Sequence, residues 1–132
     1  MTPVLFGLLA ITIQDASTPL DCSDPQSQSS MNQCAALDFQ RADKALNVAW
    51  RDMVAYVRAN NKDYGPDWDK RPSGEARLRE AQRAWITFRD AHCAVHGYEA
   101  RGGSMEPLLY ESCRAEVTQQ RTEQLRLLIS NR

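Results

Sequence analysis

Two histidines and a cysteine are the first residues whose types and spacing could do chemistry. His92 and His96 are four residues apart, so in a helix their imidazoles share a face and could bind a metal ion. Cys93 lies between them and could add a ligand only as a free thiolate. If Cys93 is oxidised, a third ligand is missing, and His92 also falls on an apolar stripe that suits a core or interfacial histidine. We therefore predict no metal site and no cofactor.

Carboxylates are the next candidates, because acid–base catalysis requires two positioned groups around a cleft. Asp43 and Asp90 are single residues in two different predicted helices, each with an arginine expected near it. The sequence contains no catalytic-triad pattern, no glycine-rich phosphate loop and no nucleophile motif. We predict that the protein is not an enzyme.

Four cysteines predict a disulfide framework and an oxidising compartment, either the periplasm or the cell exterior. They are Cys22, Cys34, Cys93 and Cys113. Three pairings are possible, and the packing of helices does not choose among them. Pairing of sequence neighbours, Cys22 with Cys34 and Cys93 with Cys113, needs the least rearrangement and is the one that we expect.

The beginning of the chain agrees with export. Residues 1–16 contain an apolar run that fits the core of a signal peptide and is too short to span a bilayer. No Lys or Arg precedes this run, so a buried N-terminal helix or strand is the alternative. The acidic residue before Cys22 does not suit lipidation, and we expect no stable membrane anchor. The formal net charge of −1 over 132 residues favours neither nucleic acid nor an anionic membrane surface.

Hydrophobic periodicity predicts an all-α fold, a small antiparallel bundle of three main helices stapled by two disulfides. Residues 17–30 are rich in Ser, Asp, Pro and Gln and suggest an irregular lead-in to a helical domain over 31–132. A capping box at residues 30–33 should open the first helix, which ends near Asn60. The second helix should begin near Ser73 and end at Gly97, and the third should begin around 104–107.

Each predicted helix carries an apolar stripe, with steps of three and four residues in the first two, which is the spacing of helices that pack side by side. The first stripe contains Ala35, Phe39, Ala42, Leu46, Ala49, Met53 and Tyr56, widened by Trp50 and Val57. The second contains Leu78, Ala81, Trp85, Phe88, His92 and Val95. The third contains Cys113, Val117, Arg121, Leu125 and Leu128.

Polar residues beside these stripes are interpreted as a structural network. Asp43 and Asn47 lie one turn apart in the first helix. Antiparallel packing brings Asp43 level with Arg89 and places Arg121 near Asn47. An ion pair with supporting hydrogen bonds could fix the helix register, and a ligand site is the alternative.

The connection over residues 61–74 is the predicted partner-binding surface. It combines Tyr64 and Trp68 with the acids Asp67 and Asp69. Exposed aromatic residues beside charge are typical anchors of protein interfaces. The alternative is that Trp68 only covers the open end of the bundle.

A set of motifs at characteristic spacings extends over about residues 22–128. It comprises Cys34-Ala35, Asp43-x-x-Leu46-Asn47, Leu78-x-x-Ala81-Gln82-x-x-Trp85-x-x-Phe88-Arg89-Asp90-x-x-Cys93, Gly102-Gly103-Ser104, Cys113 and Thr118-x-x-Arg121-x-x-x-Leu125. This pattern resembles the family typified by the N-terminal domain of the mycobacterial lysozyme inhibitor LprI. The resemblance implies a secreted or periplasmic helical domain with disulfides, and it supplies no inhibitory residue. The chain departs from the family in lacking a lipobox and in having Trp50 where Tyr is expected.

The sequence and this resemblance together predict an exported envelope binding module, with a protein partner and lysozyme as the candidate. A structural or stress-related periplasmic accessory protein without lysozyme contact is the alternative. Lysozyme is strongly basic, but Asp67 and Asp69 are interspersed with Lys70 and Arg71. We therefore expect no strong electrostatic steering toward this surface.

Overall fold

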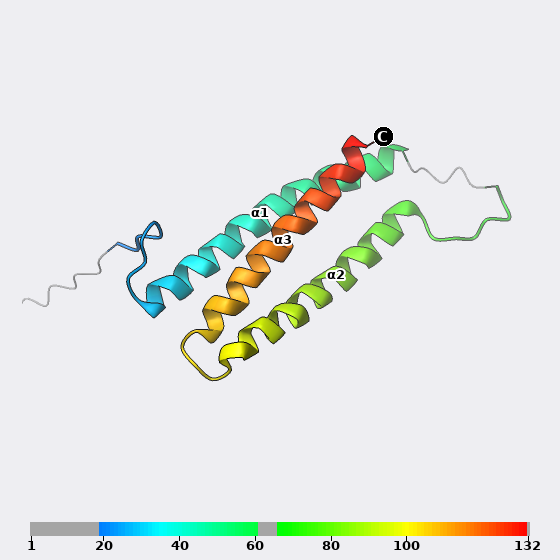
Figure 1. Ribbon diagram of the computed structural model, residues 1–132. Helices are drawn as coiled ribbons and strands as arrows, with labels where there is room; N and C mark the ends of the chain where they lie inside the picture. The colour runs from blue at the N-terminus through cyan, green and yellow to red at the C-terminus, as the bar shows by residue number, and fades with distance from the viewer. Residues whose placement is uncertain (1–18, 61–65, 132) are drawn as a thin grey trace, which may run out of the picture.

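The computed structural model describes residues 19–60 and 66–131, so the predicted signal peptide over 1–16 lies outside the described residues. The described chain forms α1 (Gln28–Asn60), α2 (Gly74–Gly97), the short 3-10 helix η1 (Tyr98–Ala100) and α3 (Glu106–Ser130), without a strand in these ranges. α2 runs antiparallel to both α1 and α3, as Figure 1 shows. The predicted all-α bundle is confirmed. None of the described helices is both long and apolar enough to cross a membrane.

The starts of α1 and α2 are set by serine caps, whereas Met105 at the start of α3 provides no side-chain cap. The N–H of Ser30 donates to Oγ of Ser27 at 3.1 Å, and the N–H of Ser27 donates to Oγ of Ser30 at 3.0 Å. The capping box expected at residues 30–33 is therefore wrong by one turn, because Ser30 is the last residue of the box over 27–30 and not the first. As a result, the last residues of the predicted lead-in are helical. At α2, Oγ of Ser73 accepts from the N–H of Ala76 at 3.2 Å, as expected from the sequence.

The core lies mainly between α1 and α3, which share the most extensive interface, while α1 and α2 share the smallest. Its buried cluster comprises Leu46, Ala49, Met53, Val57 and Leu125. The partly buried residues that pack against it are Trp50, Tyr56, Leu78, Trp85 and Ile129. The predicted stripe of α1 is confirmed, because its residues are buried or half-buried along the whole helix.

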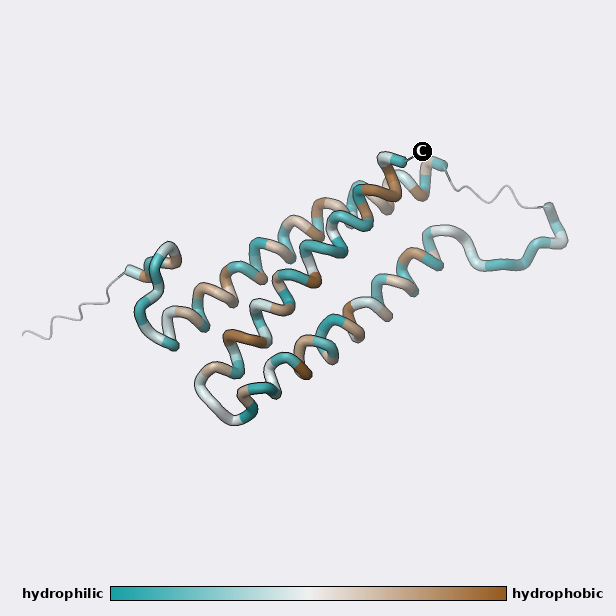
Figure 2. Tube along the Cα trace, viewed as in Figure 1, coloured by the Kyte–Doolittle hydropathy of each residue, from teal (hydrophilic) through white to brown (hydrophobic). Residues whose placement is uncertain are grey.

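The predicted stripe of α2 is largely wrong. Phe88 is 56% exposed and Val95 is 67% exposed, and Ala81 and His92 are also exposed. The face that α2 turns to its neighbours is instead formed by buried or half-buried Leu78, Gln82, Trp85, Arg89, Cys93 and Gly97. This face includes polar residues, so its periodicity is weak in a hydropathy pattern, as the alternating colours of α2 in Figure 2 show.

The predicted stripe of α3 is correct in part. Cys113 and Leu125 are buried as expected, but Leu128 is exposed. Thr118 and Thr122 are buried in its place. The hydroxyl of Thr122 donates to the backbone carbonyl of Thr118 at 3.0 Å, which satisfies the polar group inside the bundle.

Two disulfides join the elements at the end of the bundle where α1 and α3 begin and α2 ends. Cys22 is bonded to Cys34 and Cys93 to Cys113, which is the pairing expected for sequence neighbours. The first disulfide ties the lead-in to α1, and the second ties α2 to α3. Loops of 12 and 20 residues are closed in this way, and each closure should stabilise the fold by about 3 kcal/mol.

Candidate functional site

Guanidinium groups alternate with aromatic rings inside the bundle near the disulfides. Arg89 is only 6% exposed, and its guanidinium carbon lies 5.1 Å from the ring centres of both Phe39 and Trp85. The guanidinium carbon of Arg114 lies 3.7 Å from the centre of the same Phe39 ring and 5.1 Å from that of Tyr110. Side chains of all three helices therefore contribute to one stack, held by cation–π attraction where water is excluded.

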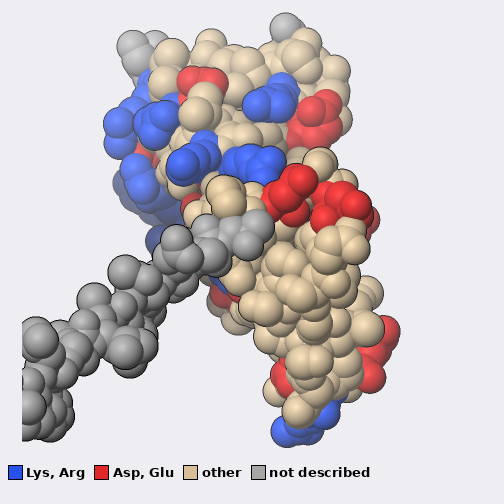
Figure 3. Space-filling model, turned by 90° about the vertical axis from the view of Figure 1, so that its left-hand side faces the viewer, with Lys and Arg blue, Asp and Glu red and all other residues tan. Residues whose placement is uncertain are grey.

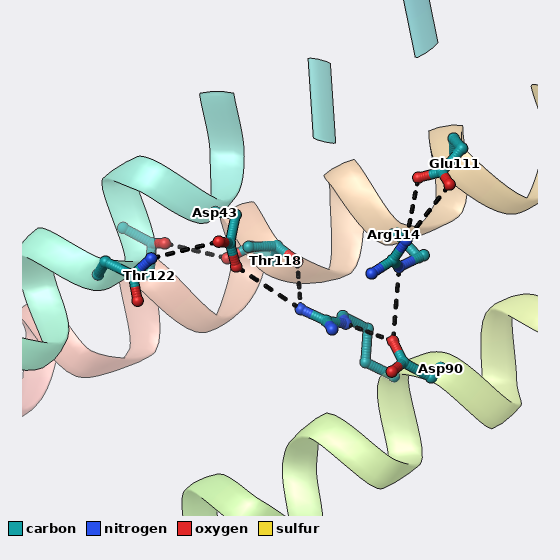
Figure 4. Close-up of polar contacts among 8 residues, drawn as sticks. Asp43, Asp90, Glu111, Arg114, Thr118 and Thr122 are labelled. Carbon is teal, nitrogen blue, oxygen red and sulfur yellow. Dashed lines mark hydrogen bonds and ion pairs between the residues drawn. The ribbon is translucent and has the colours of Figure 1, made fainter. Parts of the chain in front are cut away.

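The buried guanidinium of Arg89 also contacts carboxylates and a hydroxyl at its edge. Nε of Arg89 donates to Oδ1 of Asp90 at 2.8 Å, and NH1 of Arg89 donates to the hydroxyl of Thr118 at 3.5 Å. Figure 4 shows these contacts together with the longer approach of NH1 to Oδ1 of Asp43, at 4.0 Å. Nδ2 of Asn47 donates to Oδ2 of Asp43 at 3.2 Å. The structure thus brings together three of the four predicted network residues.

Arg121 is the predicted network residue that lies apart from Asp43. Its Nε donates to Oε1 of Gln82 at 3.1 Å, and its NH1 donates to Oε1 of Gln124 at 3.2 Å. Its guanidinium carbon lies 5.9 Å from the ring centre of Trp85, at the end of the stack. Burial lowers the pKa of Arg121, yet a guanidinium remains charged at any physiological pH.

Sequence reasoning missed Arg114 and Thr118 as members of this site. Arg114 contacts Asp90 at 3.5 Å and Glu111 at 3.2 Å, and Thr118 is fully buried. Thr118 was noted only as part of the family pattern, and the one signal for Arg114 was its position directly after Cys113. The described network pairs its charges with one another, so its geometry suits the fixing of helix register better than acid–base chemistry.

His92 and His96 lie on the exposed side of α2. The ring of His92 stacks on that of Phe88 with centres 5.2 Å apart, and the ring of His96 meets His92 edge-on at the same distance. Nitrogen atoms of both histidines lie within 4.8 Å of Sγ of Cys113. That sulfur is bonded to Cys93, so it cannot serve as a thiolate ligand. The absence of a metal site stays a prediction with this physical reason.

The predicted partner-binding surface is described in part. Tyr64 lies outside the described residues, whereas Trp68 is 78% exposed and does not cover the end of the bundle. The N–H of Asp69 donates to the carbonyl of Pro66 at 2.8 Å and closes a turn around Trp68. The carboxylate of Asp69 pairs with Arg71 at 2.6 Å, and these hydrogen bonds lower the pKa of Asp69. Asp67 is the exposed acid of the turn.

An ion pair fixes the two helix ends that carry this turn. Nε and NH2 of Arg58, near the end of α1, donate to the two carboxylate oxygens of Glu75 at 2.7 and 2.8 Å. Arg79 also donates to Glu75, at 2.8 Å. Hydrogen bonds from Arg58 and then Arg79 lower the pKa of Glu75 from 4.5 to about 2. The turn therefore extends from two helix ends that are joined by a bidentate contact.

Charge on the surface is unevenly distributed despite the small net charge. Figure 3 shows the molecule from the side on which α1 begins, with many Lys and Arg side chains gathered on one edge of its upper part and several Asp and Glu side chains on the opposite edge. A molecule with this distribution can attract different partners at different faces.

Comparison with known proteins defines the family. A sequence profile of the lysozyme inhibitor LprI family matches residues 22–125, which include all four cysteines and nearly all of the three helices. The chain belongs to the lysozyme inhibitor LprI family. An uncharacterized protein of Rhizobium meliloti strain 1021 is 45% identical to this LprI-family chain over 112 residues, covering 84% of the chain and 80% of that protein.

A solved structure supports the same assignment. The crystal structure of a DUF1311 family protein from Pseudomonas putida KT2440 is similar to this chain with a TM-score of 0.66 and 28% sequence identity. The similarity covers 81% of this chain and 97% of that protein. The LprI family is described as one of lysozyme inhibitors, which are binding proteins and not enzymes. Two disulfides are compatible with a periplasmic or extracellular location.

Proposed function

We propose that this LprI-family chain is an exported binding module of the cell envelope that inhibits a lysozyme by docking through the turn around Trp68. The observation that carries the proposal is the presentation of Trp68, which is 78% exposed. The turn lies at the end of the bundle opposite the disulfides, where the connection extends beyond the helices in Figure 1. The family assignment makes lysozyme the candidate partner.

The chemistry of the turn suits an aromatic anchor. A tryptophan can bury about 150–250 Å² in a partner pocket and is among the residues that dominate interface energetics. Asp69 is already paired with Arg71, so Asp67 is the acid available to a basic partner. We therefore expect apolar contact to supply most of the affinity and added salt to weaken binding only moderately. A convex turn is also a shape that can enter a substrate cleft.

Inhibition of cell-wall lysis by a purified lysozyme tests the proposal. The wild-type protein should slow lysis at a near-stoichiometric dose, and Trp68→Ala should weaken inhibition by about 30-fold, as expected when an interface anchor is removed. Tyr98→Ala is the matched control, because Tyr98 is a 51% exposed aromatic residue at the disulfide end. It should inhibit as the wild type does.

Two outcomes would contradict the proposal. Undiminished inhibition by a folded Trp68→Ala variant would exclude this turn as the docking surface. Absence of inhibition by the wild type would remove lysozyme as the partner and favour the accessory-protein function. Circular dichroism and thermal melting should show that both variants keep the wild-type helicity and stability, because neither side chain is part of the buried core.

A further inference from the structure

A groove between α1 and the first half of α2 lies apart from the turn around Trp68 and from the buried arginine stack. It consists of two adjoining hollows of about 240 and 330 Å³ that share Trp50 and Arg79 in their walls. The groove exists because α2 packs mainly on α3 and makes little contact with α1. Hollows that combine an aromatic ring with several polar groups are common ligand sites.

Trp50 provides a fixed aromatic surface in this groove. Its side chain is half-buried and packs against the core cluster, yet it lines both hollows. Packing on one side holds the ring in place, and the other side faces solvent. A ring held in this way can stack on the C–H face of a sugar without first losing conformational freedom.

Two side-chain amides beside Trp50 are oriented by neighbours outside the groove. Oε1 of Gln82 accepts from Arg121 at 3.1 Å, which leaves the NH2 of Gln82 as a donor. The NH2 of Asn47 donates to Asp43 at 3.2 Å, which leaves Oδ1 of Asn47 as an acceptor. Both amides line the same hollow. A fixed donor and a fixed acceptor suit the hydroxyl and acetamido groups of a saccharide.

The groove is positively charged. Arg58 and Arg79 share the single carboxylate of Glu75, so this group of three carries a net charge of +1. Exposed Arg51 and Arg83 line the two hollows and add two further positive charges. Guanidinium groups bind carboxylates and other oxyanions through charge-assisted, often bidentate hydrogen bonds. The charge therefore favours an acidic ligand over a neutral one.

We propose that this groove binds an acidic saccharide, with a sugar ring on Trp50, the amides of Asn47 and Gln82 on its polar substituents, and Arg83 on its acidic group. The proposal does not rest on lysozyme binding, since Trp68 contributes nothing to the groove and no lysozyme is needed for the test. A glycan of the cell envelope that carries carboxylates has the required chemistry.

The test follows the indole N–H resonances of the whole protein in the Trp68→Phe background during titration with three probes. The first is the disaccharide N-acetylglucosaminyl-N-acetylmuramic acid, which carries a carboxylate. The second is neutral di-N-acetylchitobiose, and the third is lactate, a carboxylate without a sugar. We expect a saturable shift of the Trp50 resonance with the acidic disaccharide, about tenfold weaker binding of chitobiose, and no shift of Trp50 with lactate.

Two arginines of α2 provide a matched pair of variants. Arg83→Gln should weaken binding of the acidic disaccharide about tenfold, because it removes the charged hydrogen bonds. Arg77→Gln changes the charge equally but lies outside the groove, where Arg77 pairs with Glu80 at 2.7 Å, and it should bind as the parent protein does. In Trp50→Leu the remaining indole resonance, that of Trp85, should not shift with the acidic disaccharide, and circular dichroism should confirm the fold.

Three results would overturn the proposal. Equal binding of all three probes, or no saturable shift of Trp50, would exclude a saccharide site. Equal weakening by Arg77→Gln and Arg83→Gln would show attraction to overall charge and not binding in the groove. Loss of inhibition in a lysozyme assay with intact glycan binding would contradict only the function proposed for the turn.

Discussion

The two ends of the bundle are built in different ways. At the end where α1 and α3 begin, two disulfides and the stack around Arg89 connect every helix to another. At the opposite end, the exposed contact of Arg58 with Glu75 joins α1 to α2, and Trp68 projects into solvent. Disulfides and the arginine stack hold one end, and the buried cluster that includes Val57 and Leu125 holds α1 on α3 toward the other. Trp68 is part of neither, so the turn around it can present residues that the core does not need.

Loss of the disulfide between α2 and α3 should have the largest effect on stability. Replacing Cys93 and Cys113 together by Ala should lower the free energy of unfolding by about 3 kcal/mol, since the link closes a loop of 20 residues. Urea unfolding under non-reducing conditions measures this change. Trp68→Ala at the opposite end is the control and should unfold as the wild type does. A loss below about 1 kcal/mol in the cysteine variant would show that this end does not dominate stability.

Removal of Arg89 should have the next largest effect. Arg89→Ala should cost about 2 kcal/mol in unfolding free energy, because it leaves a cavity between two rings and removes two cation–π contacts. The cost stays below that of a fully buried ion pair, since Asp90 can be solvated. Arg89→Met is the companion variant, and recovery of most of the loss by Met would assign the effect to packing. An Arg89→Ala protein with wild-type stability would contradict a structural role for the stack.

Asp43 should matter much less than Arg89, although both were predicted for the same network. Its side chain is 44% exposed, and its nearest guanidinium nitrogen is 4.0 Å away. Asp43→Ala should therefore lower the unfolding free energy by less than about 1 kcal/mol. Thermal and urea unfolding test this value. A loss of about 3 kcal/mol would instead indicate a tightly coupled buried pair.

Loss of the contact between Arg58 and Glu75, at the end opposite the disulfides, should have the smallest effect on stability. This effect should depend on pH in a distinctive way. The pKa of Glu75 falls from 4.5 to about 2 in the folded protein, so its contacts stabilise the fold above pH 4.5 and lose this contribution as the pH falls through about 2. The wild type should melt slightly above Glu75→Gln at pH 7, and the difference should shrink between pH 4.5 and 2. Melting curves across this range measure it. A difference that grows on acidification would contradict the assigned contact.

The first helix shows how far periodicity can predict the fold. Its stripe from Ala35 to Tyr56 is apolar and is covered by α3 along the helix, so pattern and burial agree. Pairing of neighbouring cysteines was also predictable, because it needs the least rearrangement. The order of the helices alone does not choose it, since Cys34, Cys93 and Cys113 all come to the same end.

The second helix shows where periodicity fails. Its buried face includes Gln82 and Arg89, and its solvent face includes Phe88 and Val95. A hydropathy pattern assigns arginine to the surface, whereas the guanidinium of Arg89 is buried between aromatic rings from two helices. Such a stack depends on the approach of Phe39 from α1, which no local pattern in α2 contains. The same argument applies to Thr118, whose burial follows from its contact with Arg89.

The candidate docking surface was predicted from composition alone. Trp68 and Asp67 are exposed, as an interface requires, whereas Asp69 is occupied by Arg71. Local pairing of this kind depends on the turn that begins at Pro66, so the order of charges in the sequence did not show which acid stays available.

The central claim is that the turn around Trp68 binds the partner while the disulfide end stabilises the fold. Hydrogen–deuterium exchange of the protein with and without lysozyme tests this claim most directly. We predict that lysozyme protects the backbone amides of residues 67–71, while amides near the disulfides, such as that of Tyr98, exchange as in the free protein. Trp68→Ala should lose this protection at the same lysozyme concentration. Protection centred on the disulfide end, or no protection anywhere at concentrations that inhibit lysis, would contradict the account.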